Sequence, residues 1–406
     1  MSETSSNAIP AYLPLRNDLI GEEPYGAPQL DVPVCLNVNE NPYAPEPAVV
    51  ETIAQRVKEI APTLNRYPDR EHIELRKAFS TYLERESGVK LSVDQLWGAN
   101  GSNEIMLQLF QAFGGPGRIA LGCDPTYSMY PEYARDTFTT WKLAHRNADF
   151  TLDVDATIKA IEDVKPAMIV LTSPNNPTGT PLKPEDLKRV LEAARTAEVA
   201  GAEGVHPVVV VDEAYIEFRD PGTPTALELI GEYENLAVSR TMSKAFAFAG
   251  ARVGYLAANK GIIDCVRIVR MPYHLSAVTQ AAALAAFEHT DEQLSRVAHL
   301  RETRNATSAW LKEQTYKGQP SSSAAGPKER PYRAQPLEVA ETQSNFILFG
   351  GHFDDRDRIF DELLKRGVLI RVVGPEGWMR VCMGTDEEMA RFREALVEVL
   401  RIVEQG

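Results

Sequence analysis

Val208-Val209-Val210-Val211-Asp212-Glu213-Ala214-Tyr215 is a run of four β-branched residues that leads into an acidic segment. A short apolar run without polar alternation is typical of a strand that is buried on both faces of a sheet. Similar runs occupy residues 167–171 and 236–239, and the sequence predicts a helix over 185–199. Strands separated by helices predict an α/β fold with a mostly parallel, mixed sheet covered by helices on both faces.

Two polar strings begin where predicted strands end. Asp212 directly follows the strand at 208–211, and Pro174-Asn175-Asn176-Pro177-Thr178-Gly179 follows the strand at 167–171. Ligands of parallel sheets bind at the carboxyl ends of the strands, so both strings lie where a ligand is expected. An ordinary turn is the alternative interpretation of the second string, because Asn, Pro and Gly dominate turns. A helix cap is the alternative for Asp212.

A third string follows the strand predicted at 236–239. It contains Thr241 and Ser243-Lys244, and Arg252 comes one to two helical turns after the lysine. A lysine among small hydroxyl residues, with an arginine nearby, suits a Schiff base whose neighbours hold a phosphate. This is the chemistry of pyridoxal 5′-phosphate. A solvated lysine is the alternative interpretation, because an isolated Ser-Lys pair is common by chance.

These strings give the chain a family resemblance. From about Leu15 to Arg401 it resembles the fold-type I pyridoxal-phosphate aminotransferases, and within them the histidinol-phosphate branch. Ordered marks of the resemblance run along the whole chain: Pro24-Tyr25-Gly26, Leu36-Asn37-Val38-Asn39-Glu40-Asn41-Pro42, Arg66-Tyr67-Pro68-Asp69, Gly101-Ser102-Asn103-Glu104, Pro125-Thr126-Tyr127, Asp212-Glu213-Ala214-Tyr215 and Arg380-Val381-Cys382-Met383-Gly384-Thr385.

The resemblance implies roles around the cofactor ring. Lys244 would hold the cofactor as a Schiff base and move a proton between the substrate Cα and the cofactor C4′. Asp212 would pair with the pyridine nitrogen, and Tyr215 and Asn176 would donate hydrogen bonds to the phenolic oxygen. Tyr127 would stack on the ring face, although an aromatic residue at this position could instead pack in the core.

The resemblance also implies a phosphate cup and a shared site. A helix is predicted to begin at Ser102, so free amides and the helix dipole can hold an anion there. The implied phosphate ligands are Gly101, Ser102, Asn103, Ser243 and Arg252, and Thr241 is a further implied cofactor-binding residue. The family often has Asp where this chain has Asn103, a change that leaves the amides in place. Tyr67 resembles the tyrosine that reaches the partner subunit's cofactor phosphate, which implies a homodimer.

On the substrate side the resemblance implies three residues besides Asn176. Arg380 would clamp a carboxylate with its planar guanidinium, although an arginine in a strand points to water as often as not. Arg371 and Tyr25 would meet a substrate phosphate, with Tyr25 from either subunit.

The implied reaction transfers an amino group by a ping-pong path between L-histidinol phosphate plus 2-oxoglutarate and imidazole-acetol phosphate plus L-glutamate, in histidine biosynthesis. The alternatives are an aromatic amino-acid aminotransferase on the same fold, a more distant phosphoamino-acid decarboxylase, and a regulatory module that binds the cofactor without turnover.

Composition narrows the possible partners and the compartment. The formal net charge of −14 argues against nucleic acid and anionic membrane surfaces. Cys35, Cys123, Cys265 and Cys382 are far apart and form no CxxC pair, so neither a metal site nor a disulfide framework is indicated. The chain has no signal-like N-terminus and no stretch of about 18 apolar residues. We therefore expect a soluble cytoplasmic protein.

The pattern along the chain predicts a tail and arm over 1–41, with the tail to about residue 13 mobile, a large cofactor domain over 42–290, and a small domain over 291–406. Residues 42–70 are expected to be partly shared with the small domain. A Gly-, Pro- and Ser-rich stretch at 317–336 predicts a flexible loop. The remaining expected helices cover 71–86, 291–314, 355–366 and the segment from 386, and the remaining expected strands cover 345–349, 368–372 and 379–383.

Overall fold

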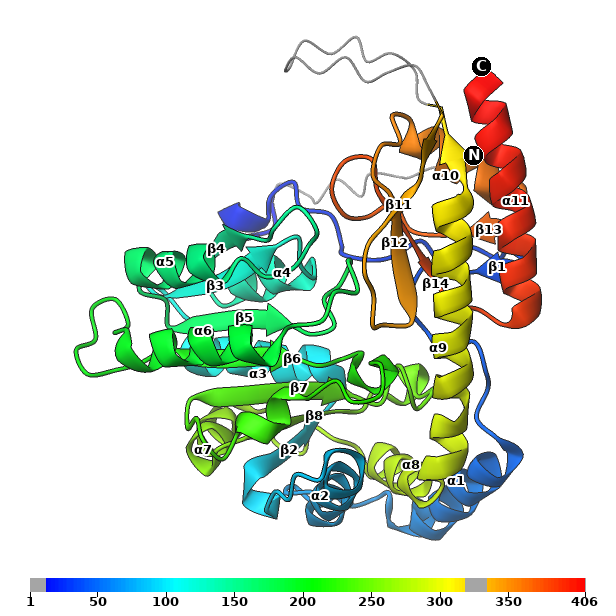
Figure 1. Ribbon diagram of the computed structural model, residues 1–406. Helices are drawn as coiled ribbons and strands as arrows, with labels where there is room; N and C mark the ends of the chain where they lie inside the picture. Colours follow the sequence, from blue (N-terminus) through cyan, green and yellow to red (C-terminus); the bar gives the residue numbers. More distant parts are fainter. Residues whose placement is uncertain (1–11, 318–333, 406) are drawn as a thin grey trace.

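A seven-stranded sheet forms the centre of the computed structural model, which describes residues 12–317 and 334–405 (Figure 1). In spatial order its strands are β2 (Leu96–Ala99), β8 (Gly254–Ala258), β7 (Leu236–Thr241), β6 (Val208–Asp212), β5 (Met168–Thr172), β3 (Ile119–Asp124) and β4 (Thr140–His145). Only β8 runs against its neighbours; the other pairings in this sheet are parallel. This arrangement confirms the predicted mixed, mostly parallel sheet.

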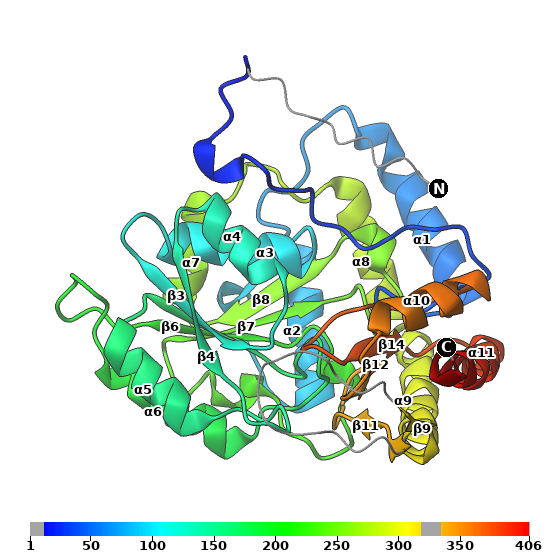
Figure 2. The same ribbon diagram turned by 90° about the horizontal axis from the view of Figure 1, so that it is seen from above.

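Helices cover both faces of the sheet, as the unbroken valine run predicts. Val208 and Val210 of β6 pack in one apolar cluster with α3 (Gly101–Phe113), α4 (Met129–Asp136) and α7 (Lys260–Val269). Val209 and Val211 point the other way, toward α5 (Val154–Val164) and α6 (Pro184–Thr196). Figure 2 shows the two helical layers on opposite sides of the strands. Alternate side chains of one strand therefore supply two cores.

Most predicted helices and strands occur within a few residues of their expected bounds. The helix predicted over 71–86 is α2 (Ile73–Ser87), and Gly88 ends it in the left-handed region with φ +73°. The bounds predicted for α6 were wrong at its C-terminal end, because the helix stops at Thr196 rather than at 199. Val199 is buried in a turn, where its own amide donates to the Val205 carbonyl. The apolar side chain of Val199 therefore packs in a turn rather than on a helix face.

The C-terminal third begins with the long helix α9 (Thr290–Glu313), which Figure 1 shows beside the last helix. A second sheet follows, in the order β11 (Glu338–Val339), β12 (Phe346–Gly350) and β14 (Met379–Cys382), together with α10 (Arg356–Lys365) and α11 (Asp386–Gln405). β13 (Val368–Leu369) pairs in parallel with β1 (Val34–Cys35) of the N-terminal arm. The division into two domains near residue 290 stays a prediction.

Two expectations for the C-terminal third need correction. The strand predicted over 368–372 ends at Leu369, because β1 ends there and the chain crosses to β14, where Arg371 forms an isolated bridge with Arg380. The loop predicted over 317–336 contains β10 (Gln335–Pro336) at its end, which pairs with β9 (Thr315–Tyr316). Residues 318–333, and residues 1–11 of the predicted tail, lie outside the described residues.

The N-terminal arm enters the fold as extended chain. Between residues 12 and 46 it contains only the short 3-10 helix at Asn17–Leu19, and α1 (Pro47–Ile60) follows, as its lack of helical period predicts. Figure 2 shows this segment crossing the molecule on its way to α1. Within residues 12–317 and 334–405, no helix has the length and apolar character needed to cross a membrane.

Candidate active site

A cavity of about 410 Å³ opens where the parallel strands end. Thr172, Asp212 and Thr241 are the last residues of β5, β6 and β7, and all three line the cavity. Because β8 is antiparallel, it begins at the edge where its neighbours end, and this places Arg252 at the same cavity. The strand-end rule therefore accounts for most of the pocket.

The structure brings nearly all of the predicted site residues together. The following line the one cavity: Tyr25, Ser102, Asn103, Tyr127, Asn176, Asp212, Tyr215, Thr241, Ser243, Lys244, Arg252, Arg371 and Arg380. Gly101 is not part of the lining but packs closely against the Arg252 guanidinium. Tyr67 lies outside the cavity; its side chain is 80% exposed and stacks on Tyr273 with ring centroids 4.4 Å apart.

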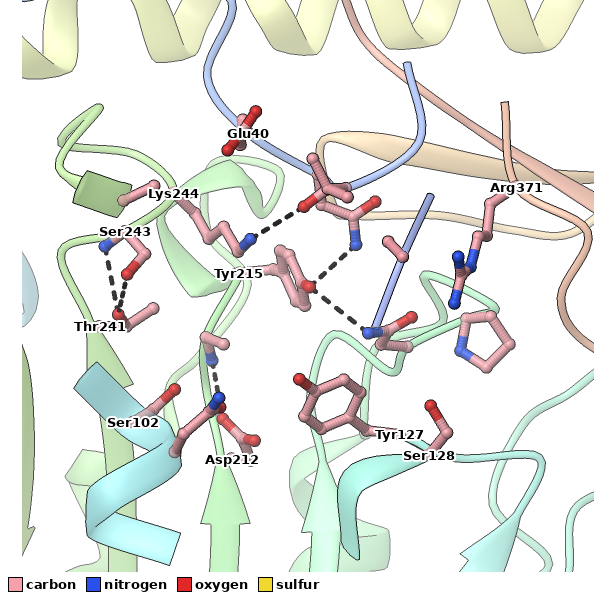
Figure 3. Close-up of a pocket in the computed structure, with 18 of the residues that line it drawn as sticks. Glu40, Ser102, Tyr127, Ser128, Asp212, Tyr215, Thr241, Ser243, Lys244 and Arg371 are labelled. Atoms are coloured by element: carbon pink, nitrogen blue, oxygen red, sulfur yellow. Dashed lines mark hydrogen bonds between the residues drawn. The ribbon is translucent and has the colours of Figure 1, made fainter. Parts of the chain in front are cut away.

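Lys244 reaches the pocket from the turn that follows β7. The Ser243 amide donates to Thr241 Oγ1 at 3.1 Å, and Lys244 Nζ donates to the Val38 carbonyl at 3.1 Å (Figure 3). Burial lowers the pKa of Lys244 to about 8, and the charge of Arg380 acts in the same direction. A neutral amine is therefore within reach near physiological pH.

The segment between Lys244 and Arg252 contains no α-helix, although the spacing of the two residues was interpreted as one to two helical turns. It forms an irregular turn and the 3-10 helix Ala249–Ala251, and Arg252 has a left-handed conformation with φ +56°. The reason is topological, because the chain must reverse direction to enter the antiparallel strand β8. This reversal, rather than a helix face, brings the lysine and the arginine to one pocket.

Asp212 forms the floor of the pocket. Tyr130 Oη donates to its Oδ2 at 2.8 Å, and the Ala214 amide donates to its Oδ1 at 3.2 Å. Burial raises the pKa of Asp212 to about 6, while the two hydrogen bonds act in the opposite direction. The carboxyl is thus mostly ionised at neutral pH although it is enclosed, which is an arrangement that favours a cationic partner.

Tyr215 receives hydrogen bonds from two amides. Asn39 Nδ2 lies 2.9 Å and Asn176 Nδ2 3.4 Å from its hydroxyl oxygen. Arg380 Nη1 donates to Asn176 Oδ1 at 2.6 Å, which fixes the direction of that amide. Burial raises the pKa of Tyr215 to about 12, so the phenol keeps its proton. With its oxygen accepting from both sides, the hydroxyl can donate into the pocket.

Closely packed glycines form a cradle at the start of α3. A Cβ on Gly101 would lie 2.5 Å from Arg252 Nη2, and Gly101 has φ +78°. A Cβ on Gly254 would lie 2.3 Å from the Ser102 amide nitrogen. The glycines let the guanidinium and the start of the helix lie together, and the first amides of a helix together with a cation suit a phosphate.

The two arginines predicted to contact substrate lie on one face of a strand pair. Arg371 and Arg380 are directly opposed in an antiparallel bridge, and opposed residues point to the same side. Arg371 Nη2 lies 3.4 Å from the Gly26 carbonyl, and Tyr25 Oη lies 2.9 Å from Ser128 Oγ. Tyr25 therefore lies at the pocket of its own chain. Figure 3 shows Arg371 and Lys244 on opposite sides of Tyr215.

Sequence reasoning missed several residues that support the site. Asn39 belongs to a string that carries the resemblance, yet its bond to Tyr215 was not predicted; a buried asparagine with φ +58° is its structural signature. Cys382 Sγ donates to Asn39 Oδ1 at 2.8 Å. Tyr130 lies three residues after Tyr127, which precedes α4, and this nearness was its only signal in the sequence.

Comparison with known proteins shows the family of the chain. A family model described as aminotransferase class I and II matches residues 32–396. The chain belongs to this family. It is 96% identical to the histidinol-phosphate aminotransferase of Bifidobacterium adolescentis, over 100% of both chains. It is 51% identical to the protein of that name from Thermobifida fusca, over 95% of each chain.

Solved structures of the family share the fold. The histidinol-phosphate aminotransferase of Sinorhizobium meliloti, solved in complex with pyridoxal-5′-phosphate, aligns with a TM-score of 0.74 at 22% identity over 92% of each chain. The aspartate aminotransferase of Thermus thermophilus with maleate aligns with a TM-score of 0.70 at 22% identity, over 91% of this chain and 92% of that one. At this identity the likeness concerns the fold alone.

Proposed function

We propose that this aminotransferase moves the amino group between L-histidinol phosphate plus 2-oxoglutarate and imidazole-acetol phosphate plus L-glutamate, a step of histidine biosynthesis, with pyridoxal 5′-phosphate as its cofactor. The observation that carries the proposal is the 96% identity to the histidinol-phosphate aminotransferase of Bifidobacterium adolescentis over the whole chain. The pocket agrees with it, because a partly buried amine, a buried carboxylate and three arginines line one cavity.

The residues of the pocket fit the cofactor group by group. Lys244 would bond the aldehyde, Asp212 the ring nitrogen and Tyr215 the phenolic oxygen, while the cradle of Gly101 and Arg252 would hold the phosphate. When bound, the cofactor supplies an electron sink for the carbon that loses its proton. Asn176 would add a second donor on the phenolic side, and Tyr127 would cover the ring face.

The chain's own groups supply the proton chemistry. Because its pKa is lowered to about 8, Lys244 can be neutral when it accepts a proton from the substrate Cα. Val38 holds its amine with a single backbone contact, which leaves the side chain free to turn when the substrate displaces it. Asp212 stays in place throughout, because both of its oxygens are held.

Two arginines would receive the acidic groups of both substrates. Arg380 is anchored by Asn176 and by the Asn37 carbonyl, while its buried Nε has no hydrogen-bond partner among the described residues. A buried N–H without a partner is costly, and a carboxylate or phosphate oxygen would satisfy it. Arg371 on the same face would bind the second anionic group or the phosphate.

We also propose a homodimer and a cytoplasmic location. Tyr67 is 80% exposed although it stacks on Tyr273, and nearby Leu64 and Met271 are at least half exposed, as expected for a surface that a second copy covers. Tyr67 would then reach the partner's cofactor phosphate. All four cysteines are free thiols, which suits a reducing compartment.

A half-reaction experiment tests the proposed substrate. The cofactor-loaded enzyme is mixed separately with histidinol phosphate, glutamate and phenylalanine while the cofactor absorbance is recorded. We expect fast conversion by the first two and slow conversion by phenylalanine. If phenylalanine reacts as fast or faster, the substrate belongs to the aromatic class.

Lys244→Ala should abolish the reaction without unfolding the chain; near-normal turnover would refute the role of the lysine.

Arg371→Ala tests the phosphate role directly. We expect the KM for histidinol phosphate to rise ~10-fold or more, as for a lost charge-assisted hydrogen bond, and the KM for phenylalanine to change far less. Arg391→Ala, at an exposed position of α11, is the matched control and should leave both values unchanged. Equal effects of Arg371→Ala on the two substrates would contradict the assignment.

A further inference from the structure

Tyr130 is a buried tyrosine next to the pocket that the proposed proton chemistry does not use. It lies in the first turn of α4, its side chain is fully buried, and its ring packs edge-on against Tyr127 with centroids 5.5 Å apart. Its hydroxyl oxygen lies 2.8 Å from Asp212 Oδ2 and 2.8 Å from Thr172 Oγ1. Tyr130 thus joins the ends of β5 and β6 through one hydroxyl group.

The direction of these hydrogen bonds follows from the acceptor. An ionised carboxylate has no proton to give, so Tyr130 donates to Asp212. The tyrosine has only one proton, so its oxygen must accept from the Thr172 hydroxyl. The result is a one-way chain of donors from Thr172 through Tyr130 to Asp212. Neighbouring hydrogen bonds of this kind polarise and strengthen one another.

We propose that Tyr130 is a positioning residue that holds Asp212 ionised and aimed at the ring nitrogen of the cofactor. The inference rests on the proposed function only in requiring that the cofactor binds. With Ala214 on one oxygen and Tyr130 on the other, the carboxylate cannot rotate, and its remaining lone pairs are available to the protonated nitrogen. Without the tyrosine hydroxyl, the enclosed charge loses a donor, so the proton shared with the ring moves toward the aspartate.

The chain offers a matched control on the same helix. Tyr133 lies one turn after Tyr130 and is also buried, but within the described part of the chain its hydroxyl has no hydrogen-bond partner. Tyr130→Phe and Tyr133→Phe therefore remove the same atom from the same helix. Only the first removes a hydrogen bond to Asp212. Thr172→Val removes the outer donor and leaves both rings intact.

The test uses enzyme loaded with cofactor that is ¹⁵N-labelled in the ring, and NMR reports whether this nitrogen carries a proton. We expect it to be protonated in the wild type and Tyr133→Phe, and to shift toward the unprotonated signal in Tyr130→Phe. The cofactor dissociation constant should rise ~10-fold or more in Tyr130→Phe, as for a lost hydrogen bond to a charged group, and by a smaller factor in Thr172→Val.

An unchanged ring-nitrogen signal in Tyr130→Phe, with cofactor affinity within twofold of Tyr133→Phe, would overturn the proposal. If Tyr130→Phe does not fold, Thr172→Val decides, and a wild-type signal and affinity in that variant would equally overturn it. The readout does not depend on the substrate. A wild-type enzyme that prefers phenylalanine would remove the proposed substrate and leave the role of Tyr130 standing.

Discussion

Replacing Gly101 with alanine is expected to weaken cofactor binding through Arg252. Gly101 has φ +78°, and a Cβ there would lie 2.5 Å from Arg252 Nη2. The backbone cost of a left-handed alanine is about 1–2 kcal/mol, and it falls on the fold with or without cofactor. The guanidinium must also move away from the cradle. Losing its charge-assisted bond to the phosphate costs about 1.5–3 kcal/mol, or roughly 10- to 150-fold in affinity.

Gly88→Ala separates these two effects. Gly88 has φ +73° at the end of α2, and nothing lies within 4 Å of a Cβ built there. Both variants should therefore lower the melting temperature of the cofactor-free enzyme by similar amounts. Only Gly101→Ala should raise the cofactor dissociation constant, measured by fluorescence titration. Equal dissociation constants for the two variants would refute the idea that the missing Cβ lets Arg252 hold the phosphate.

Two further predictions concern stability. Burial lowers the pKa of His72 to about 3, so below its ordinary value of 6.5 only the unfolded chain takes up this proton and stability is lost as the pH falls. By pH 5 the free energy of unfolding has fallen by about 2 kcal/mol. In urea unfolding, this pH-dependent loss of stability should disappear in His72→Gln and persist in His145→Gln, which changes an exposed histidine. Arg240→Ala should lower the free energy of unfolding by about 3–5 kcal/mol, because it leaves the buried Glu213 carboxylate without its ion-pair partner. The surface variant Arg56→Ala should lower it by about 1 kcal/mol or less, and thermal melts of both variants measure the difference.

The sequence predicts best those features that depend on neighbours along the chain. The valine run of β6 could be assigned to a doubly covered sheet because each residue's burial follows from its own position in the alternation. Asp212 and Asn176 could be placed at a ligand site because the ends of parallel strands meet at one edge. In both cases the physical rule acts over a few residues, so one sequence is enough.

Contacts between distant segments could not be predicted in this way. Tyr130 and Asp212 are 82 residues apart, and Asn39 and Tyr215 are 176 residues apart, so no local pattern marks either pair. The reversal before β8 was also missed, since eight residues after a lysine fit a helix as well as a turn. What the sequence lacks here is the path of the chain, which decides the partner of each buried polar group.

The two arginines proposed to bind substrate are held to different degrees, and this difference bears on how one pocket accepts two substrates. Arg380 is buried and donates to Asn176 at 2.6 Å and to the Asn37 carbonyl at 2.9 Å, so its guanidinium has one orientation. Arg371 is only partly buried, and its contact with the Gly26 carbonyl, at 3.4 Å, is long for a hydrogen bond. A fixed cation suits the group that both substrates place alike, whereas a loosely held one can follow groups of different shape.

We therefore expect Arg371→Lys, which keeps a mobile charge, to retain more activity with glutamate than Arg380→Lys, which loses the planar fork. Equal losses in steady-state assays of the two variants would contradict this division of roles.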